Sequence, residues 1–331
     1  MSRRGCSILV AAFFGLVLAA PAHGASMVFV KRGDVFMARP DGSRQVPITR
    51  NGTPGRPYFS PSIADNGTIV ALRGIHLHSF RPNGRRIIRP RQWAVLGPNL
   101  WTEPFTVDLS PNGRVVATDN ALYSTAYDPR RSENRPSRTA LFVDFVDFRT
   151  NGAKGESDSF YDYAGPSWVG SNSVLTTSYG LFNAQILQVR VGRRSRGTEF
   201  YRDPARDPNT GTNAIEMADV EMTRRRDKFA VERRPVQGAN SLRDGTIQIF
   251  RTGSPTTNSE PRCTIGPGRR IDRAPDPSWS PDGRTLYWHE IGRGIFSSRV
   301  TSAAGCGLRP RRIVGGALSP DLSRANVPRR R

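Results

Sequence analysis

The sequence is poor in the residue types that most often carry catalysis and metal binding. Its 331 residues include only three cysteines and four histidines, and lysine occurs only at Lys31, Lys154 and Lys228 although lysine and arginine together number 49. Arginine therefore supplies nearly all of the positive charge. The formal charge of +21 has two interpretations: attraction to an anionic polymer, or arginine-rich turns that reflect codon bias and solvated surface.

Long hydrophobic runs are also missing, with one exception near the start of the chain. The apolar stretch Ile8–Ala20 is shorter than the about 20 residues that a transmembrane helix needs. Arg3 and Arg4 precede it, and Pro21 and small residues follow it, which is the pattern of a cleaved signal peptide. We therefore predict a signal peptide over residues 1–25 and an exported protein that is periplasmic, associated with the cell envelope or extracellular. No segment of the mature chain is expected to cross a membrane.

Two cysteines, Cys263 and Cys306, remain after removal of the signal peptide. In an oxidising compartment such a pair favours a structural disulfide. Two free buried thiols are the alternative that the sequence leaves open.

The usual catalytic and cofactor motifs are not found. The chain has no Gly-x-Ser-x-Gly stretch before a helix, as a serine hydrolase would have, and no glycine-rich phosphate loop before a helix. His76 and His78 share one face of an expected strand and could begin a zinc site, but no cysteine or carboxylate lies close in sequence to complete it. We therefore predict no catalytic, cofactor-binding or metal-binding residues and no cofactor.

Glycine and proline are abundant, at 32 and 26 residues, as in turn-rich all-β proteins. The stretch "PSWSPDGRTLYW", residues 277–288, explains why. After a short strand, Ser280, Pro281, Asp282 and Gly283 form an expected turn: proline fixes φ, aspartate bonds the nearby backbone, and glycine takes a positive φ. An alternating second strand follows.

The same pattern recurs along the chain. "VDLSPNGRVVAT", residues 107–118, has Ser110, Pro111, Asn112 and Gly113 at the turn. Weaker copies cover residues 62–72, 166–177, 218–232 and 316–327, and in the last of these the turn is expected at Ser319-Pro320-Asp321. Together these make six copies, and internal repeats of this length indicate a repeat architecture.

The two ends of the mature chain each hold half of a repeat. "MVFVKRGDVFMARPDGS", residues 27–43, is a strand pair without a leading copy, and the copy at 316–327 has no strand pair after it. Sharing one sheet between the ends would close a ring and remove free sheet edges. We predict an all-β, six-bladed β-propeller as a single domain over residues 26–328, with a basic tail at 329–331.

The stretches at residues 277–288, 107–118 and 27–43 resemble the repeats of the TolB-like, or WD40-like (PD40), six-bladed β-propellers. The resemblance covers nearly all of the mature chain. It implies a structural role for the turn residues Ser280–Gly283 and Ser110–Gly113, and it implies protein–protein contacts in the periplasm.

The sequence thus predicts an exported, non-catalytic, monomeric propeller that acts as a protein-interaction or ligand-binding scaffold at the cell envelope. The expected partner is a protein or an anionic envelope polymer, without specific nucleic-acid binding. Polar stretches at residues 119–139 and 192–213 are candidate binding loops. One alternative is a propeller enzyme with an axial-channel site, either a hydrolase or lactonase or a quinoprotein-type dehydrogenase. Another is a nonspecific polyanion binder. Three or more Asp, Glu or His side chains along the axis would favour the enzyme.

Overall fold

The computed structural model describes residues 25–92, 100–124, 138–147, 152–156, 163–179, 184–191, 197–203, 215–235, 245–252, 261–266, 276–301, 305–306 and 310–328. Every regular element in these ranges is a β-strand. Among the described residues there is no helix of the length and hydrophobicity needed to cross a bilayer. The predicted signal peptide, except Ala25, and the basic tail lie outside these ranges, as do large parts of the two candidate binding loops.

The described strands form six antiparallel sheets. The first joins β25 (Ala317–Ser323), β1 (Ser26–Lys31), β2 (Asp34–Ala38) and β3 (Val46–Pro47). The second joins β4 (Phe59–Ile63), β5 (Ile69–Arg73), β6 (His76–Phe80) and β7 (Arg91–Gln92). The third joins β8 (Leu100–Leu109), β9 (Val115–Ser124), β10 (Arg138–Asp147) and β11 (Gly152–Glu156).

The remaining three sheets follow the same order along the chain. The fourth joins β12 (Tyr163–Trp168), β13 (Ser173–Tyr179), β14 (Ala184–Arg190) and β15 (Thr198–Arg202). The fifth joins β16 (Ile215–Met222), β17 (Lys228–Pro235), β18 (Thr246–Arg251) and β19 (Cys263–Ile265). The sixth joins β20 (Ser278–Trp279), β21 (Thr285–Glu290), β22 (Gly294–Thr301) and β23 (Gly305–Cys306), with β24 (Arg311–Gly315) also paired to β22.

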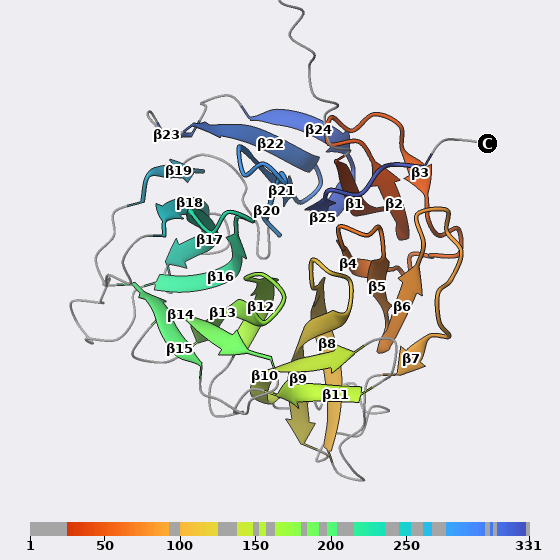
Figure 1. Cartoon of the computed structure of the whole chain (residues 1–331), viewed down its shortest axis with the longest axis horizontal. Coiled ribbons are helices and arrows are strands. Elements are labelled where there is room, and N and C mark those ends of the chain that lie inside the picture. The colour runs from red at the N-terminus through yellow and green to blue at the C-terminus, as the bar shows by residue number, and fades with distance from the viewer. Residues whose placement is uncertain are drawn as a thin grey trace, which may run out of the picture.

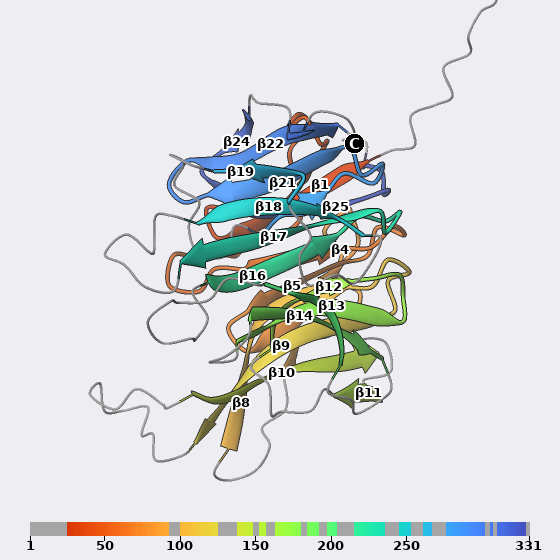
Figure 2. The ribbon, with the colours of Figure 1, turned by 90° about the vertical axis from the view of Figure 1, so that its left-hand side faces the viewer.

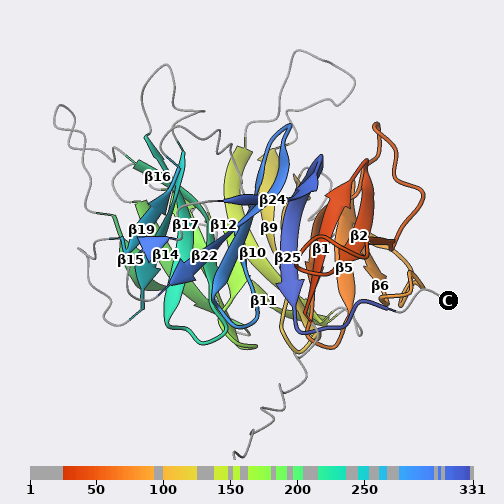
Figure 3. The same ribbon diagram turned by 90° about the horizontal axis from the view of Figure 1, so that it is seen from above.

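The sheets are arranged around a central axis, as a β-propeller (Figure 1). The innermost strands contact one another in sequence, from β4 through β8, β12, β16 and β20 to β25, and β25 contacts β4. Six apolar clusters of described residues each join two neighbouring sheets. Both faces of a sheet are therefore covered, which explains why β1 is buried along Ser26–Val30. Figures 2 and 3 show the stacked sheets from the side and from above.

The first and last described strands share one sheet. Strand β1 pairs antiparallel with β25, with Ser26 opposite Ser323 and Lys31 opposite Ala317. On its other edge β1 pairs with β2. The sharing of a sheet by the chain ends, which the half-repeats predict, is confirmed.

The two best-preserved turns have the same geometry. Gly113 and Gly283 both have φ of 68°. In each turn the serine N–H donates to a residue five positions later, Ser110 to the Val115 carbonyl and Ser280 to the Thr285 carbonyl, both at 2.8 Å. The serine hydroxyl also bonds the turn Asn112 or Asp282. Each turn thus satisfies its own polar groups and connects the first two strands of a sheet.

The prediction of a turn at Ser319-Pro320-Asp321 is wrong. These residues lie inside β25, which is the innermost strand of its sheet. The Ser-Pro-Asp triplet occurs at two different places in the repeat, before the turn in an inner strand and within the turn itself. In this copy it occupies the inner-strand position, which places Asp321 on the axis.

The predicted Cys263–Cys306 disulfide stays a prediction, because the side chain of Cys306 lies outside the described residues. Two observations support it. Strand β19, which begins at Cys263, contacts β23, which ends at Cys306. Cys263 is also disulfide-bonded in the structure.

Candidate functional site

The innermost strand of every sheet places one polar side chain at the same level of the axis. We call this set the belt, and it consists of Ser62, Asp108, Ser167, Glu221, Ser278 and Asp321. Serine and acidic residues alternate around it. Five of the belt residues stand next to the end of their inner strand, and Asp321 stands two residues before the end of β25.

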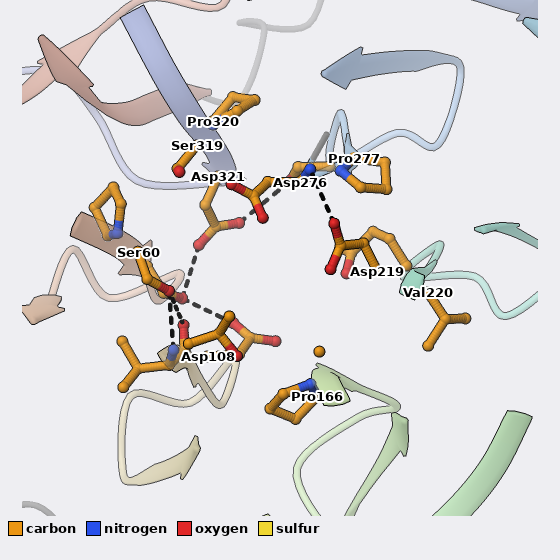
Figure 4. A pocket seen from close by; sticks show the side chains of 17 residues that line it. Ser60, Asp108, Pro166, Asp219, Val220, Asp276, Pro277, Ser319, Pro320 and Asp321 are labelled. Carbon is orange, nitrogen blue, oxygen red and sulfur yellow. Dashed lines mark hydrogen bonds between the residues drawn. The ribbon is translucent and has the colours of Figure 1, made fainter. Parts of the chain in front are cut away.

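A second level, the mouth, lies two residues before each belt residue and consists of Ser60, Thr106, Gly165, Asp219, Asp276 and Ser319. Five of these have a positive φ: 44° at Ser60, 60° at Gly165, 47° at Asp219, 42° at Asp276 and 50° at Ser319. Register shifts in β4, β12, β16 and β25 mark β-bulges at this level. Such bulges redirect side chains, and Ser60, Asp219, Asp276 and Ser319 line the same cavity (Figure 4).

Ser62 links two of the belt carboxyl groups. Its Oγ lies 2.8 Å from Asp108 Oδ1 and 2.8 Å from Asp321 Oδ2, and it accepts a 3.0 Å hydrogen bond from the Leu109 N–H. A hydroxyl has one hydrogen and can direct it along only one of the two short contacts. The other contact is favourable when its carboxyl group carries a proton, so this geometry favours a proton on Asp108 or Asp321.

Backbone N–H groups of the next sheet also bond the belt. The donor follows its own belt residue, and the acceptor is the belt side chain of the preceding sheet. These bonds run from Leu109 to Ser62, from Trp168 to Asp108 Oδ2 at 3.2 Å, from Met222 to Ser167 at 3.4 Å, from Leu322 to Ser278 at 3.2 Å and from Ile63 to Asp321 Oδ2 at 2.7 Å. The belt therefore fastens neighbouring sheets together and joins β4 to the C-terminal strand.

The belt carboxyl groups have raised pKa values. Burial, and then the charge of Asp321, raise the pKa of Asp108 to about 7. Burial raises the pKa of Asp321, and burial together with the charge of Asp108 raises that of Glu221 well above its usual range. Arg224 opposes the shift at all three. Desolvation and mutual repulsion thus favour the protonated forms, in agreement with the hydrogen-bond count at Ser62.

Cavities lie on both sides of the belt. The one at the mouth has a volume of about 80 Å³. There, the Asp276 carboxylate lies 3.6 Å from Nδ1 of the buried His289, which also accepts the Ser319 N–H. The Asp219 carboxylate accepts a 3.5 Å bond from the Asp276 N–H.

The cavity on the opposite side of the belt has a volume of about 220 Å³. We call it the arginine chamber, after Arg224, Arg226 and Arg324 in its lining. Arg224 Nη2 lies 3.0 Å from Asp65 Oδ1, whereas Arg224 Nη1 is buried without a hydrogen-bond partner among the described residues. Asp65 Oδ1 also accepts the Arg324 N–H, at 3.0 Å.

Of the residues that the sequence predicts to form turns, Pro111 lines the arginine chamber, and Ser319, Pro320 and Asp321 line the mouth cavity. The other sequence-predicted residues lie outside this site. The turns at Ser110–Gly113 and Ser280–Gly283 connect strands, and the cysteines lie in β19 and β23. His78 is buried against Tyr58 and Phe80, and burial lowers its pKa to about 4. Within the described ranges no three His, Cys, Asp or Glu side chains are grouped to hold a metal ion.

Sequence reasoning missed the belt, although the repeat carries a signal for it. Ser62, Asp108 and Ser278 each stand five residues before the glycine of their turn. In the other three copies Asn172, Arg226 and Asn326 stand at the glycine position, so this spacing marks only three of the six belt residues. The convergence of these side chains follows only once the repeats are closed into a ring.

No protein-family profile matches the sequence, and no curated protein matches it. Among solved structures, the chain is similar to TolB from Acinetobacter baumannii, with 14% identity, a TM-score of 0.55 and coverage of 90% of this chain and 66% of that one. A protein of unknown function from Bacteroides caccae gives a TM-score of 0.52 at 8% identity, covering 91% and 98% of the two chains. An oligogalacturonate lyase in complex with manganese gives a TM-score of 0.51 at 8% identity, and the match covers 85% of this chain and 70% of that one. These likenesses show a TolB-like propeller fold.

Proposed function

We propose that the chain is an exported, non-catalytic, six-bladed propeller that serves as a binding scaffold at the cell envelope, with each of the six sheets as one blade. Its axial channel is the contact site for a segment of a partner protein. The signal-peptide pattern and the resemblance of the repeats support export and an envelope location.

The observation that carries this proposal is the way the belt side chains are used. Asp108 and Asp321 each accept a backbone N–H from the next sheet and contact the Ser62 hydroxyl. These bonds hold the sheets together, so the belt is a rigid floor between two cavities. A preorganised channel with polar walls suits recognition, because binding to a rigid site costs less conformational entropy.

The test is capture of partners by the mature protein from an envelope extract at moderate salt. The variant Asp219→Asn/Asp276→Asn removes charge at the mouth but keeps the hydrogen-bond acceptors, and Asp41→Asn makes the same change in an exposed turn. We expect the mouth variant to weaken the binding of a captured partner at least about tenfold, or about 1.4 kcal/mol, and Asp41→Asn to leave it unchanged. Equal binding by all three proteins would refute the channel as the contact site.

The axial-channel enzyme remains the second candidate, because five described carboxylates line the mouth cavity and this meets the criterion set out above. The Asp108 carboxyl, with its pKa raised by burial to about 7, is in the range of a general acid or base. This candidate predicts turnover of an ester, lactone or alcohol substrate that Asp108→Asn abolishes and Asp282→Asn, in a turn, preserves. Screening both variants against such substrates tests it.

A nonspecific polyanion binder is the third candidate, favoured only by the formal charge of +21. It predicts partner binding that falls steeply with salt. Capture that persists at high salt and depends on the mouth carboxylates would exclude it.

A further inference from the structure

The arginine chamber brings three arginines together, of which Arg224 is partly buried and Arg226 and Arg324 are exposed. Arg224 and Arg226 come from the connection between β16 and β17, and Arg324 directly follows β25. Of the described side chains in the lining, Asp65 is the carboxylate that pairs with Arg224. We propose that this chamber binds a small organic anion, with a carboxylate or phosphate group held by Arg224 and an apolar body against the chamber wall.

Arg224 has hydrogen-bonding capacity to spare. One side of its guanidinium group is paired with Asp65, but Nη1 is buried and donates to no described group. A buried donor without a partner is destabilising, and a guanidinium group presents parallel N–H groups that match two oxygens of a carboxylate or phosphate. An anion beside Nη1 would satisfy these donors.

The belt carboxyl groups Asp108, Glu221 and Asp321 also line the chamber, and they oppose the arginines only to the extent that they are ionised. The two short contacts of Ser62 favour a proton on Asp108 or Asp321. Burial raises the pKa of all three carboxyl groups, which reduces their negative charge further. A protonated carboxyl group can itself donate a hydrogen bond to an anion.

The remaining wall is apolar and of limited size. The indole N–H groups of Trp168 and Trp279 donate to the carbonyls of Asp108 and Glu221, so both indoles are fixed with their polar atoms in use. Leu109 and Met222 lie beside them. A volume of about 220 Å³ equals roughly seven water molecules at ~30 Å³ each, which suits a compact aromatic or aliphatic acid.

The experiment titrates the mature protein, residues 26–331, with benzoate, acetate and inorganic phosphate, and follows tryptophan fluorescence and binding heat. Benzamide serves as the neutral analogue of benzoate. We expect at least one of the anions to bind with saturation and benzamide to bind at least about tenfold more weakly. Preference for benzoate over phosphate identifies a carboxylate with an apolar body, and the reverse identifies a phosphate group. Equal binding of benzoate and benzamide, or no saturable binding, would overturn the proposal.

Variants distinguish binding in the chamber from a general attraction of anions to positive charge. Arg224→Ala should weaken binding about tenfold or more, and Arg312→Ala, an exposed arginine on the outer strand β24, should not. Asp65→Asn should strengthen binding, because it removes the anion that competes for Arg224, whereas a purely structural role for the pair predicts weaker binding. Equal effects of Arg224→Ala and Arg312→Ala, or weaker binding in a folded Asp65→Asn, would refute the site.

This inference rests on the proposed function only in treating the axial channel as a binding site. Its titration uses purified protein and the chamber arginines, whereas partner capture uses an extract and the mouth carboxylates. Either can therefore fail without the other.

Discussion

Replacing Asp108 by asparagine should make the protein relatively more stable as the pH rises. Burial and the charge of Asp321 raise the pKa of Asp108 from 3.8 to about 7 in the folded protein. The folded state therefore binds the proton more tightly than the unfolded state. Between about pH 4 and pH 7 the unfolded chain has lost this proton and the folded chain retains it, so raising the pH disfavours folding, and the effect is complete above the folded pKa.

The magnitude follows from the shift. About three pKa units at ~1.36 kcal/mol each correspond to about 4 kcal/mol, and because Asp108 titrates together with Asp321 we expect about 2–4 kcal/mol for the single replacement. Asparagine does not titrate, but its carbonyl can still accept the Trp168 N–H and its amide can donate to Ser62 Oγ. The variant therefore keeps the hydrogen bonds between the sheets and loses the pH-dependent contribution of Asp108 to stability.

The assay is urea unfolding of the mature wild type and Asp108→Asn at pH 4, 6 and 8. We expect the free energy of unfolding of the variant, relative to wild type, to increase by about 2–4 kcal/mol between pH 4 and pH 8. Asp282→Asn is the control, and its stability relative to wild type should change with pH in the opposite direction. Partial burial would raise the pKa of Asp282, but hydrogen bonds from Ser280 and Arg284 outweigh burial and lower this pKa. If the free energies of unfolding of wild type and Asp108→Asn change with pH in parallel, the raised pKa of Asp108 is refuted.

Two further predictions concern stability. Gly165→Ala and Gly74→Ala both place a Cβ at positive φ, 60° and 57°, which should cost about 1–2 kcal/mol of stability in each case. Only at Gly165 is the new Cβ also crowded: it would lie 3.1 Å from Asp219 Oδ1 and 3.3 Å from the Asp219 backbone. Urea unfolding should show a further loss of about 1–3 kcal/mol for Gly165→Ala, and equal losses would contradict the crowded mouth. Peptide mapping without reductant should find Cys263 joined to Cys306, and Cys306→Ser should lose about 2–4 kcal/mol; separate peptides would contradict the disulfide.

The propeller could be predicted because its turns are encoded locally. Ser280–Gly283 and Ser110–Gly113 combine proline, an acid or amide, and glycine in an order that fixes a turn without help from the rest of the chain. The half-repeats at the ends then indicate ring closure. The last copy was misassigned because Ser319-Pro320-Asp321 fits both the turn and the inner strand, and local sequence does not separate the two.

The site was harder to predict because its residues meet only in three dimensions. Asp108, Glu221 and Asp321 come from three different sheets, and none of them forms a motif with its sequence neighbours. Their raised pKa values depend on mutual approach and burial. Arg224 stands in a run of three arginines that looks like solvated surface charge, and only its burial beside Asp65 distinguishes it.

The pairing of β1 with β25 bears on the order in which the sheets are completed. Of the described strands, β25 is the last to be synthesised, and until it pairs, β1 has one unpaired edge and the Ile63 N–H lacks its Asp321 acceptor. A chain in which β25 has not yet paired thus offers an open sheet edge of the kind that favours aggregation. Assembly is completed by a single late event, when a few C-terminal residues take their place between the first and second sheets.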